Sequence, residues 1–168
     1  RVWLKKQGFK ITQTGGDVFI LPTANPDQLA LLSTGKIDAV WTVEPWVSRL
    51  EQEAGGRVFL EQRDVVTTLL VSSVRLLKEH PELAQKFRAA HVELTGWINA
   101  HADDARELVR AGLSAETRRE FSAELVAGAW PRLHFTADLA PAQFEGLVAD
   151  AQGAGFLPDA IPLDRLFS

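Results

Sequence analysis

Short apolar runs alternate with helical segments over the first 64 residues of the chain. Three such runs lie at residues 18–21, 37–43 and 58–60, and a glycine or proline stands within two residues of each. Runs of this length are typical of strands that are buried on both faces of a parallel sheet. The order strand, helix, strand, helix, strand therefore predicts an α/β fold with a doubly wound parallel sheet.

Helix signals fill the intervals between these runs. Asn25 is a good N-cap, and Pro26 suits the first turn of the helix that follows it. A glycine stands within two residues of the end of each predicted helix, as expected for a helix stop. The helices predicted in this half of the chain cover residues 1–7, 25–34 and 46–53.

The pattern changes after residue 64. A β-branched run at 65–71 is followed by helical segments almost to the end of the chain. Pro81 begins the clearest helix, Gly112 is expected to end a shorter one, Ser114 is expected to cap the next, and Pro141 begins the last. The apolar residues of the clearest helix fall on one stripe, which consists of Leu83, Phe87, Ala90, Leu94, Trp97 and Ile98.

Neither half supplies all the structure that it needs. Three short strands require flanking strands, and the later helices require a sheet to cover. The chain also opens on Arg1 within a helical pattern and contains no methionine. We therefore expect parts of two units, residues 1–64 and residues 65–168, that belong to a longer protein.

Composition excludes several classes of function. Lysine and arginine number 18 against 22 aspartates and glutamates, the net charge is −4, and no basic stripe occurs, so nucleic acid is not an expected partner. The absence of cysteine excludes disulfides, thiolate metal sites and a cysteine nucleophile. No phosphate-binding, nucleophile-elbow or zinc-protease motif is present. The sequence thus predicts no metal, no cofactor and no catalytic residues.

The segment from Trp41 to Trp46 is the strongest candidate for a binding site. It lies where a predicted parallel strand ends and a helix begins, which is where open α/β sheets bind ligands. Two indoles can form flat walls, and Thr42 and Glu44 can anchor polar groups. The alternative is that Trp41 belongs to the core and Trp46 packs the helix onto the sheet. We expect Trp46 and Glu44, more than Trp41, to face a cleft.

Two further segments can reach the same edge of the sheet. Residues 21–26 form the turn one strand earlier, and the free N–H groups at the start of its helix can hold an anion. The alternative there is a capped helix without a ligand. The run at 65–71 can cross between the two units as a hinge, with Thr67 and Thr68 near the cleft. Ordinary filling of the sheet is its alternative.

Several segments, in their order and spacing, resemble the nitrate, sulfonate and taurine substrate-binding proteins of ABC importers, the NMT1/THI5-like family. They are residues 25–32, 35–41, 44–46, 54–57, 70–73, 77–83, 132–136 and 155–157. The resemblance implies a type II periplasmic-binding-protein fold, of which the chain holds parts of two lobes, each a doubly wound sheet flanked by helices. Residues 1–64 would be the later part of the second lobe. Residues 65–168 would be the return crossover strand and the last helices of the first lobe.

The resemblance also implies roles for individual residues. Asn25 would lie at the ligand edge of the first loop, Trp41 and Trp46 would be walls, and Glu44 would orient the ligand or the loop. Thr67 would lie near the cleft on the crossover. A carboxylate beside a sulfonate or nitrate is repulsive unless it is paired or points away, so a ligand with a cationic or N–H group, such as taurine or a pyrimidine, would suit Glu44 better.

The implied function is binding without chemistry. The lobes would close on a small-molecule ligand, and the closed protein, a monomer, would dock on an ABC permease in the membrane. The implied location is the periplasm or another extracytoplasmic space, with a signal peptide in a preceding segment. Two alternatives remain open: a protein that binds or makes the thiamine-pyrimidine precursor, and an effector-sensing domain of a LysR-type regulator.

Overall fold

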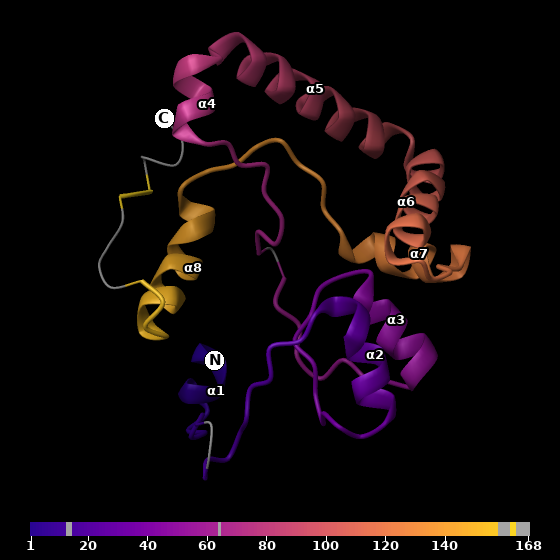
Figure 1. The fold of residues 1–168 in the computed structure, drawn as a ribbon, viewed down its shortest axis with the longest axis vertical. Coiled ribbons are helices and arrows are strands. Elements are labelled where there is room, and N and C mark those ends of the chain that lie inside the picture. Colours follow the sequence, from indigo (N-terminus) through magenta and orange to yellow (C-terminus); the bar gives the residue numbers. More distant parts are fainter. Residues whose placement is uncertain (13–14, 64, 158–161, 164–168) are drawn as a thin grey trace. The chain divides into compact units, whose positions relative to one another are not determined.

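The computed structural model describes residues 1–12, 15–63, 65–157 and 162–163. They form eight α-helices and one short 3-10 helix (Figure 1). In chain order these are α1 (Val2–Lys6), α2 (Asn25–Ser33), α3 (Trp46–Ala54), α4 (Val74–Glu79), α5 (Pro81–Ala100), α6 (Ala102–Thr117), α7 (Ala123–Ala129), η1 (Trp130–Arg132) and α8 (Ala142–Gly153). In the described ranges, no helix is both long enough and apolar enough to cross a membrane.

The chain divides into two compact units. One comprises Arg1–Thr23, Asp64–Val66 and Asp138–Ser168, and the other comprises Ala24–Arg63 and Thr67–Ala137. These units differ from the two predicted ones, which divide the chain at residue 64 and refer to the two lobes of a binding-protein fold. The division into lobes stays a prediction. Asp64 itself, and residues 164–168 at the end of the second predicted unit, lie outside the described residues.

No strand forms within the described residues. Their β-structure is a single isolated parallel bridge between Ile11 and Val18. The runs at 18–21, 37–43, 58–60 and 65–71 were predicted as strands, but their described residues pair with no neighbour in a ladder. The physical reason is that a strand needs a neighbouring strand for its N–H and C=O groups, and these runs do not provide one for each other. The doubly wound sheet therefore stays a prediction.

Local signals located most of the helices correctly. Helices α1, α2 and α3 occupy the three segments predicted in the first half, and α5 begins at Pro81 as expected. Gly55 adopts the left-handed conformation (φ 64°) and ends α3. One detail differs: Asn25 is the first helical residue of α2 and not its N-cap, which is Ala24. The Asn25 side chain is therefore free to bond elsewhere.

The region between α6 and α7 corrects another prediction. Helix α6 continues through Gly112 and Ser114 to Thr117. Ser114 Oγ donates to Arg110 O at 2.8 Å, a bond within the helix, and it accepts from Phe121 N at 3.1 Å. The helix ends instead at Arg118, which is left-handed (φ 52°), and the N-cap of α7 is Ser122.

The core of the larger unit is centred on Phe121, which is fully buried. Helix α3 packs on α2 and α7, and α7 packs on α6. The Trp46 ring meets the Phe121 ring edge-on at 5.7 Å, and the Arg49 guanidinium lies over the same ring at 5.2 Å. Phe121 and Leu125 are both buried there. These contacts fix α3, and with it the turn that precedes α3.

Helix α5 is different, because its apolar stripe is largely uncovered. Leu83, Phe87 and Leu94 are exposed, and the buried residue of this helix is Thr95. In the other unit, Phe144 of α8 is buried, whereas Leu147 of the same helix is exposed.

Candidate functional site

The turn between the run at 37–43 and α3 lies against the start of α2. Asn25 Oδ1 accepts a hydrogen bond from Gln28 Nε2 at 3.0 Å and a second from Thr42 Oγ1 at 3.4 Å. The Asn25 side chain thus joins two of the segments that the sequence proposed for one site. The structure brings Asn25, Thr42, Glu44 and Trp46 into one neighbourhood of the larger unit.

The two tryptophans of the turn differ in their exposure to solvent. Trp41 is 66% exposed, whereas Trp46 is half-buried and packs against Phe121. Trp46 was expected to face a cleft, but it is the first residue of α3, and its ring is held by the core. Trp41 precedes the turn on a run that joins no ladder among the described residues, and its ring is open to solvent. Trp41 is therefore the more exposed indole of the turn.

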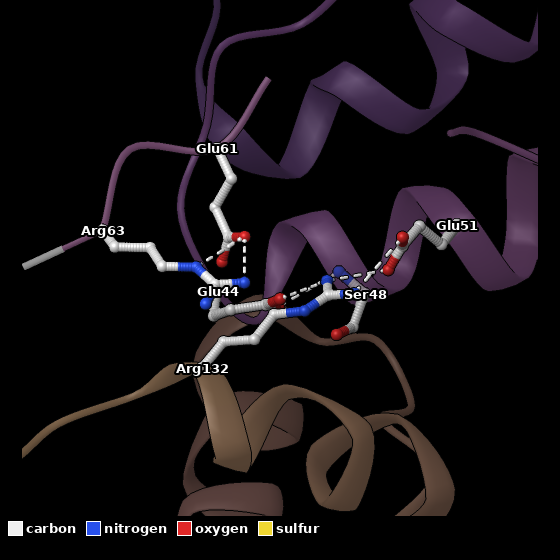
Figure 2. Close-up of polar contacts among 6 residues, drawn as sticks. All are labelled: Glu44, Ser48, Glu51, Glu61, Arg63 and Arg132. Atoms are coloured by element: carbon white, nitrogen blue, oxygen red, sulfur yellow. Dashed lines mark hydrogen bonds and ion pairs between the residues drawn. The ribbon is translucent and has the colours of Figure 1, made fainter. Parts of the chain in front are cut away.

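Glu44 is buried and uses both of its carboxylate oxygens inside the protein (Figure 2). Oε2 accepts from the backbone N–H of Ser48 at 3.0 Å, and Oε1 accepts from Arg132 Nη1 at 2.8 Å. The side chain is only 5% exposed. A carboxylate at the first turn of a helix satisfies a free N–H and complements the helix dipole. Glu44 therefore orients the loop and offers no free carboxylate to a ligand.

Arg132 of η1 pairs with two carboxylates of the α3 region. Its Nη1 lies 2.8 Å from Glu44 Oε1 and 2.8 Å from Glu51 Oε2, and its Nη2 lies 3.4 Å from Glu51 Oε1. The hydrogen bonds with Glu51 and then Glu44 raise the pKa of Arg132 above its usual value, so the guanidinium stays charged. Sequence reasoning missed this residue, because 88 positions separate it from Glu44 and no local spacing signals the pair.

Other predicted or polar residues stand apart from this group. Thr67 is exposed and, within the described residues, makes no hydrogen bond to the turn. Two buried polar atoms of the described residues lack a hydrogen-bond partner, Gln28 Oε1 in α2 and Arg49 Nη1 in α3. The other nitrogens of the Arg49 guanidinium group pair with Glu53. The structure thus supports Asn25 and the turn as one group and leaves Thr67 outside it.

A hollow of about 250 Å³ between α6 and α7 is not part of this group. Its charged residues pair with one another: Asp103 with Arg106, and Glu107 with Arg110. The hydrogen bond from Arg110 lowers the pKa of Glu107. Among the described residues, no three histidine or acidic side chains come together as a metal site.

Comparison with known proteins adds a family and a set of relatives. The NMT1-like family matches residues 1–113. Proteins named 2'-hydroxybiphenyl-2-sulfinate desulfinase, from Rhodococcus erythropolis and Rhodococcus qingshengii, are 30% identical over 110 residues. The match covers 63% of this chain and 29% of each relative, so the chain spans less than a third of the length of these curated relatives. No solved structure matches the chain.

Proposed function

The chain belongs to the NMT1-like family, and from this membership we propose that it contributes to a solute-binding protein that clamps a small sulfonate-like or sulfinate-like anion between two lobes. Membership implies a periplasmic-binding-protein fold. The doubly wound sheets of the two lobes, the extracytoplasmic location and delivery to an ABC permease are finer parts of the same proposal.

The observation that carries this proposal is the state of Glu44. A free carboxylate at the turn would repel an anionic ligand, but here both oxygens are occupied by Ser48 N–H and Arg132. The exposed ring of Trp41 and the helix start at Asn25, whose first turn also carries the exposed Asp27, then remain as groups that a ligand can contact. An indole excludes water without charge bias, and a helix N-terminus favours an anion.

The residue roles in the proposal follow from this arrangement. Trp41 is the wall of the site. Asn25 ties the helix start to Thr42, Glu44 holds the turn, and Trp46 anchors it to the core. Thr67 stays a candidate on the crossover segment.

An enzyme that acts on an aryl sulfinate is the second candidate, favoured by the desulfinase relatives. Such an enzyme would share the anion site and add a catalytic group. The sulfinate is the probe that separates the two candidates, because a binding protein would leave it intact.

Titration calorimetry with 2'-hydroxybiphenyl-2-sulfinate, an alkanesulfonate, taurine, nitrate and the thiamine pyrimidine tests the proposal. We expect saturable one-to-one binding of a sulfinate or sulfonate and no release of sulfite over hours. Release of sulfite would assign the enzyme. Binding of the pyrimidine alone, or of none of the five, would contradict the anion proposal.

A further inference from the structure

We propose that Arg132 determines specificity at the turn 41–46: by neutralising Glu44, it makes the surface beside Trp41 accessible to an anionic group. The identity of the ligand rests on the proposed function, but the charge effect does not. Residue 132 lies beyond the residues 1–113 that match the family, so the family match assigns it no role.

The first step of the argument is that the Glu44 charge is compensated from a distant part of the chain. Arg132 belongs to η1, whereas Glu44 belongs to the turn before α3, and their atoms meet at 2.8 Å. In the part of the chain that the structure describes, Glu44 has no other ion-pair partner. The compensation of the Glu44 charge therefore depends on Arg132 of η1, which follows α7, the helix that packs on α3, and not on the turn itself.

The second step is that, within the described residues, Arg132 is the cation that pairs with both Glu44 and Glu51. Glu44 and Glu51 together bring two negative charges, and Arg132 brings one positive charge to both. The nearest buried cation in sequence, Arg49, is engaged by Glu53. Removal of Arg132 would leave two carboxylates beside the turn, one of them almost fully buried, where a charge is weakly screened.

The third step separates a charge effect from a structural clamp. Arg132 is partly exposed (38% for the side chain), and the contact between Trp46 and Phe121 does not involve it. Glu44 Oε2 has a hydrogen bond of its own, from the Ser48 N–H. An Arg132→Gln variant is thus expected to fold with the turn in place and to change mainly the local potential.

Fluorescence quenching of Trp41 measures that potential without any ligand. Iodide is an anionic quencher and acrylamide is a neutral one. The fluorescence of Trp41 is obtained by subtracting the fluorescence of the same protein with the additional substitution Trp41→Phe. Three proteins are compared: the parent chain, the single variant Arg132→Gln, and the double variant that carries both Arg132→Gln and Glu44→Gln. Arg110→Gln is the matched control, because it removes an arginine that pairs with a carboxylate on α6.

At pH 8 and low salt, we expect Arg132→Gln to lower the iodide quenching constant of Trp41 about twofold and to leave the acrylamide constant unchanged. Addition of Glu44→Gln should restore most of the iodide constant, and Arg110→Gln should change neither constant. An unchanged iodide constant in Arg132→Gln would overturn the proposal. So would an equal change with both quenchers, or a failure of Glu44→Gln to restore it, since these results indicate a clamp.

Ligand binding gives the second readout. Arg132→Gln should weaken binding of 2'-hydroxybiphenyl-2-sulfinate about tenfold and binding of 2-hydroxybiphenyl, which lacks the sulfinate, by twofold or less. Equal weakening of both compounds would overturn the specificity role. If the parent chain binds neither compound, the proposed ligand is wrong, and the quenching result alone decides the role of Arg132.

Discussion

Glu44 shows how one side chain can determine what its neighbours present to solvent. Its carboxylate accepts a hydrogen bond from Ser48 N–H in the first turn of α3 and pairs with Arg132, so both of its oxygens bond to groups of the protein. Pro45 follows it through a cis peptide bond. Trp41 and Val43 remain exposed. A ligand at this turn would meet an apolar face and a helix start whose first turn carries the exposed Asp27, whereas the carboxylate of Glu44 is engaged inside the protein.

The two tryptophans of the turn should respond differently to truncation. Trp41→Ala is expected to weaken ligand binding about fivefold to thirtyfold, because a few tens of Å² of aromatic face at about 25 cal/mol per Å², with ordering effects, contribute roughly 1–2 kcal/mol. The free energy of unfolding should change by about 0.5 kcal/mol or less, since the ring is exposed. Calorimetry and urea unfolding measure the two quantities.

Trp46→Ala is the matched variant. It removes the edge contact with Phe121 and is expected to lower the free energy of unfolding by about 2 kcal/mol, with Trp46→Phe recovering much of the loss. If Trp41→Ala proves as destabilising as Trp46→Ala, the Trp41 ring is buried in solution and the site is misplaced.

Glu44→Gln should destabilise the larger unit measurably. The amide oxygen can still accept from Ser48 N–H, but the charged bond to Arg132 is lost, and we expect a decrease of about 1–2 kcal/mol in the free energy of unfolding. Glu61→Gln is the control, because it breaks an exposed pair with Arg63 that is worth about 0.5 kcal/mol or less. Equal effects of the two substitutions in urea unfolding would show that the buried pair contributes little.

The pair of Glu44 and Arg132 also marks a limit of prediction from sequence at the residue scale. The Trp41 to Trp46 segment could be singled out, because a turn with two indoles, a carboxylate and a proline is unusual wherever it lies. The orientation of its side chains could not be predicted, because it depends on contacts with Phe121 and Arg132. These residues lie 75 to 88 positions later in the sequence and reach the turn only through tertiary packing.

At the scale of elements, prediction succeeded where the signal is local. Pro81 begins α5 and Gly55 ends α3, because a proline ring and a left-handed glycine act on their own turn of backbone. The helix end predicted at Gly112 and the helix start predicted at Ser114 were wrong, because neither residue type has to interrupt a helix. A helical glycine costs only about 1 kcal/mol relative to alanine, and a serine hydroxyl can bond back to the carbonyl four residues earlier.

The true end of α6 gives a prediction for that element. Arg118 holds a left-handed conformation that an L side chain adopts at a cost, and glycine adopts it freely. Arg118→Gly is therefore expected to raise the free energy of unfolding by about 0.5–1 kcal/mol in urea, whereas Arg118→Ala should give no gain. A loss of stability with glycine would mean that the Arg118 side chain makes contacts that outweigh the backbone relief.

At the scale of the whole molecule, the main difference between prediction and structure is the sheet, because the four apolar runs predicted as its strands are unpaired among the described residues. Phe59 is 75% exposed, and Trp41, Leu70 and Val71 are exposed as well. Surfaces of this kind usually belong to a partner element. A run of apolar residues signals a strand, but only pairing makes one, and pairing depends on backbone that the described residues do not supply. The family implies a periplasmic-binding-protein fold, and the sequence pattern predicts strands that do not form among the described residues.

Hydrogen exchange tests this difference segment by segment. An amide exchanges slowly only if it is hydrogen-bonded and rarely opens, so extended backbone without a ladder should exchange at nearly the unfolded rate. In the 168-residue chain we expect the amides of residues 19–21, 37–43, 58–60 and 65–71 to exchange within seconds at neutral pH, whereas the Val18 amide is hydrogen-bonded to Lys10 O. The amides of α3 and α7, which pack around Phe121, should exchange at least about a hundredfold more slowly and serve as the internal control. Protection of the four runs comparable to that of α3 would instead show that they pair in solution, and the sheet of the predicted α/β fold would then be present in this chain alone.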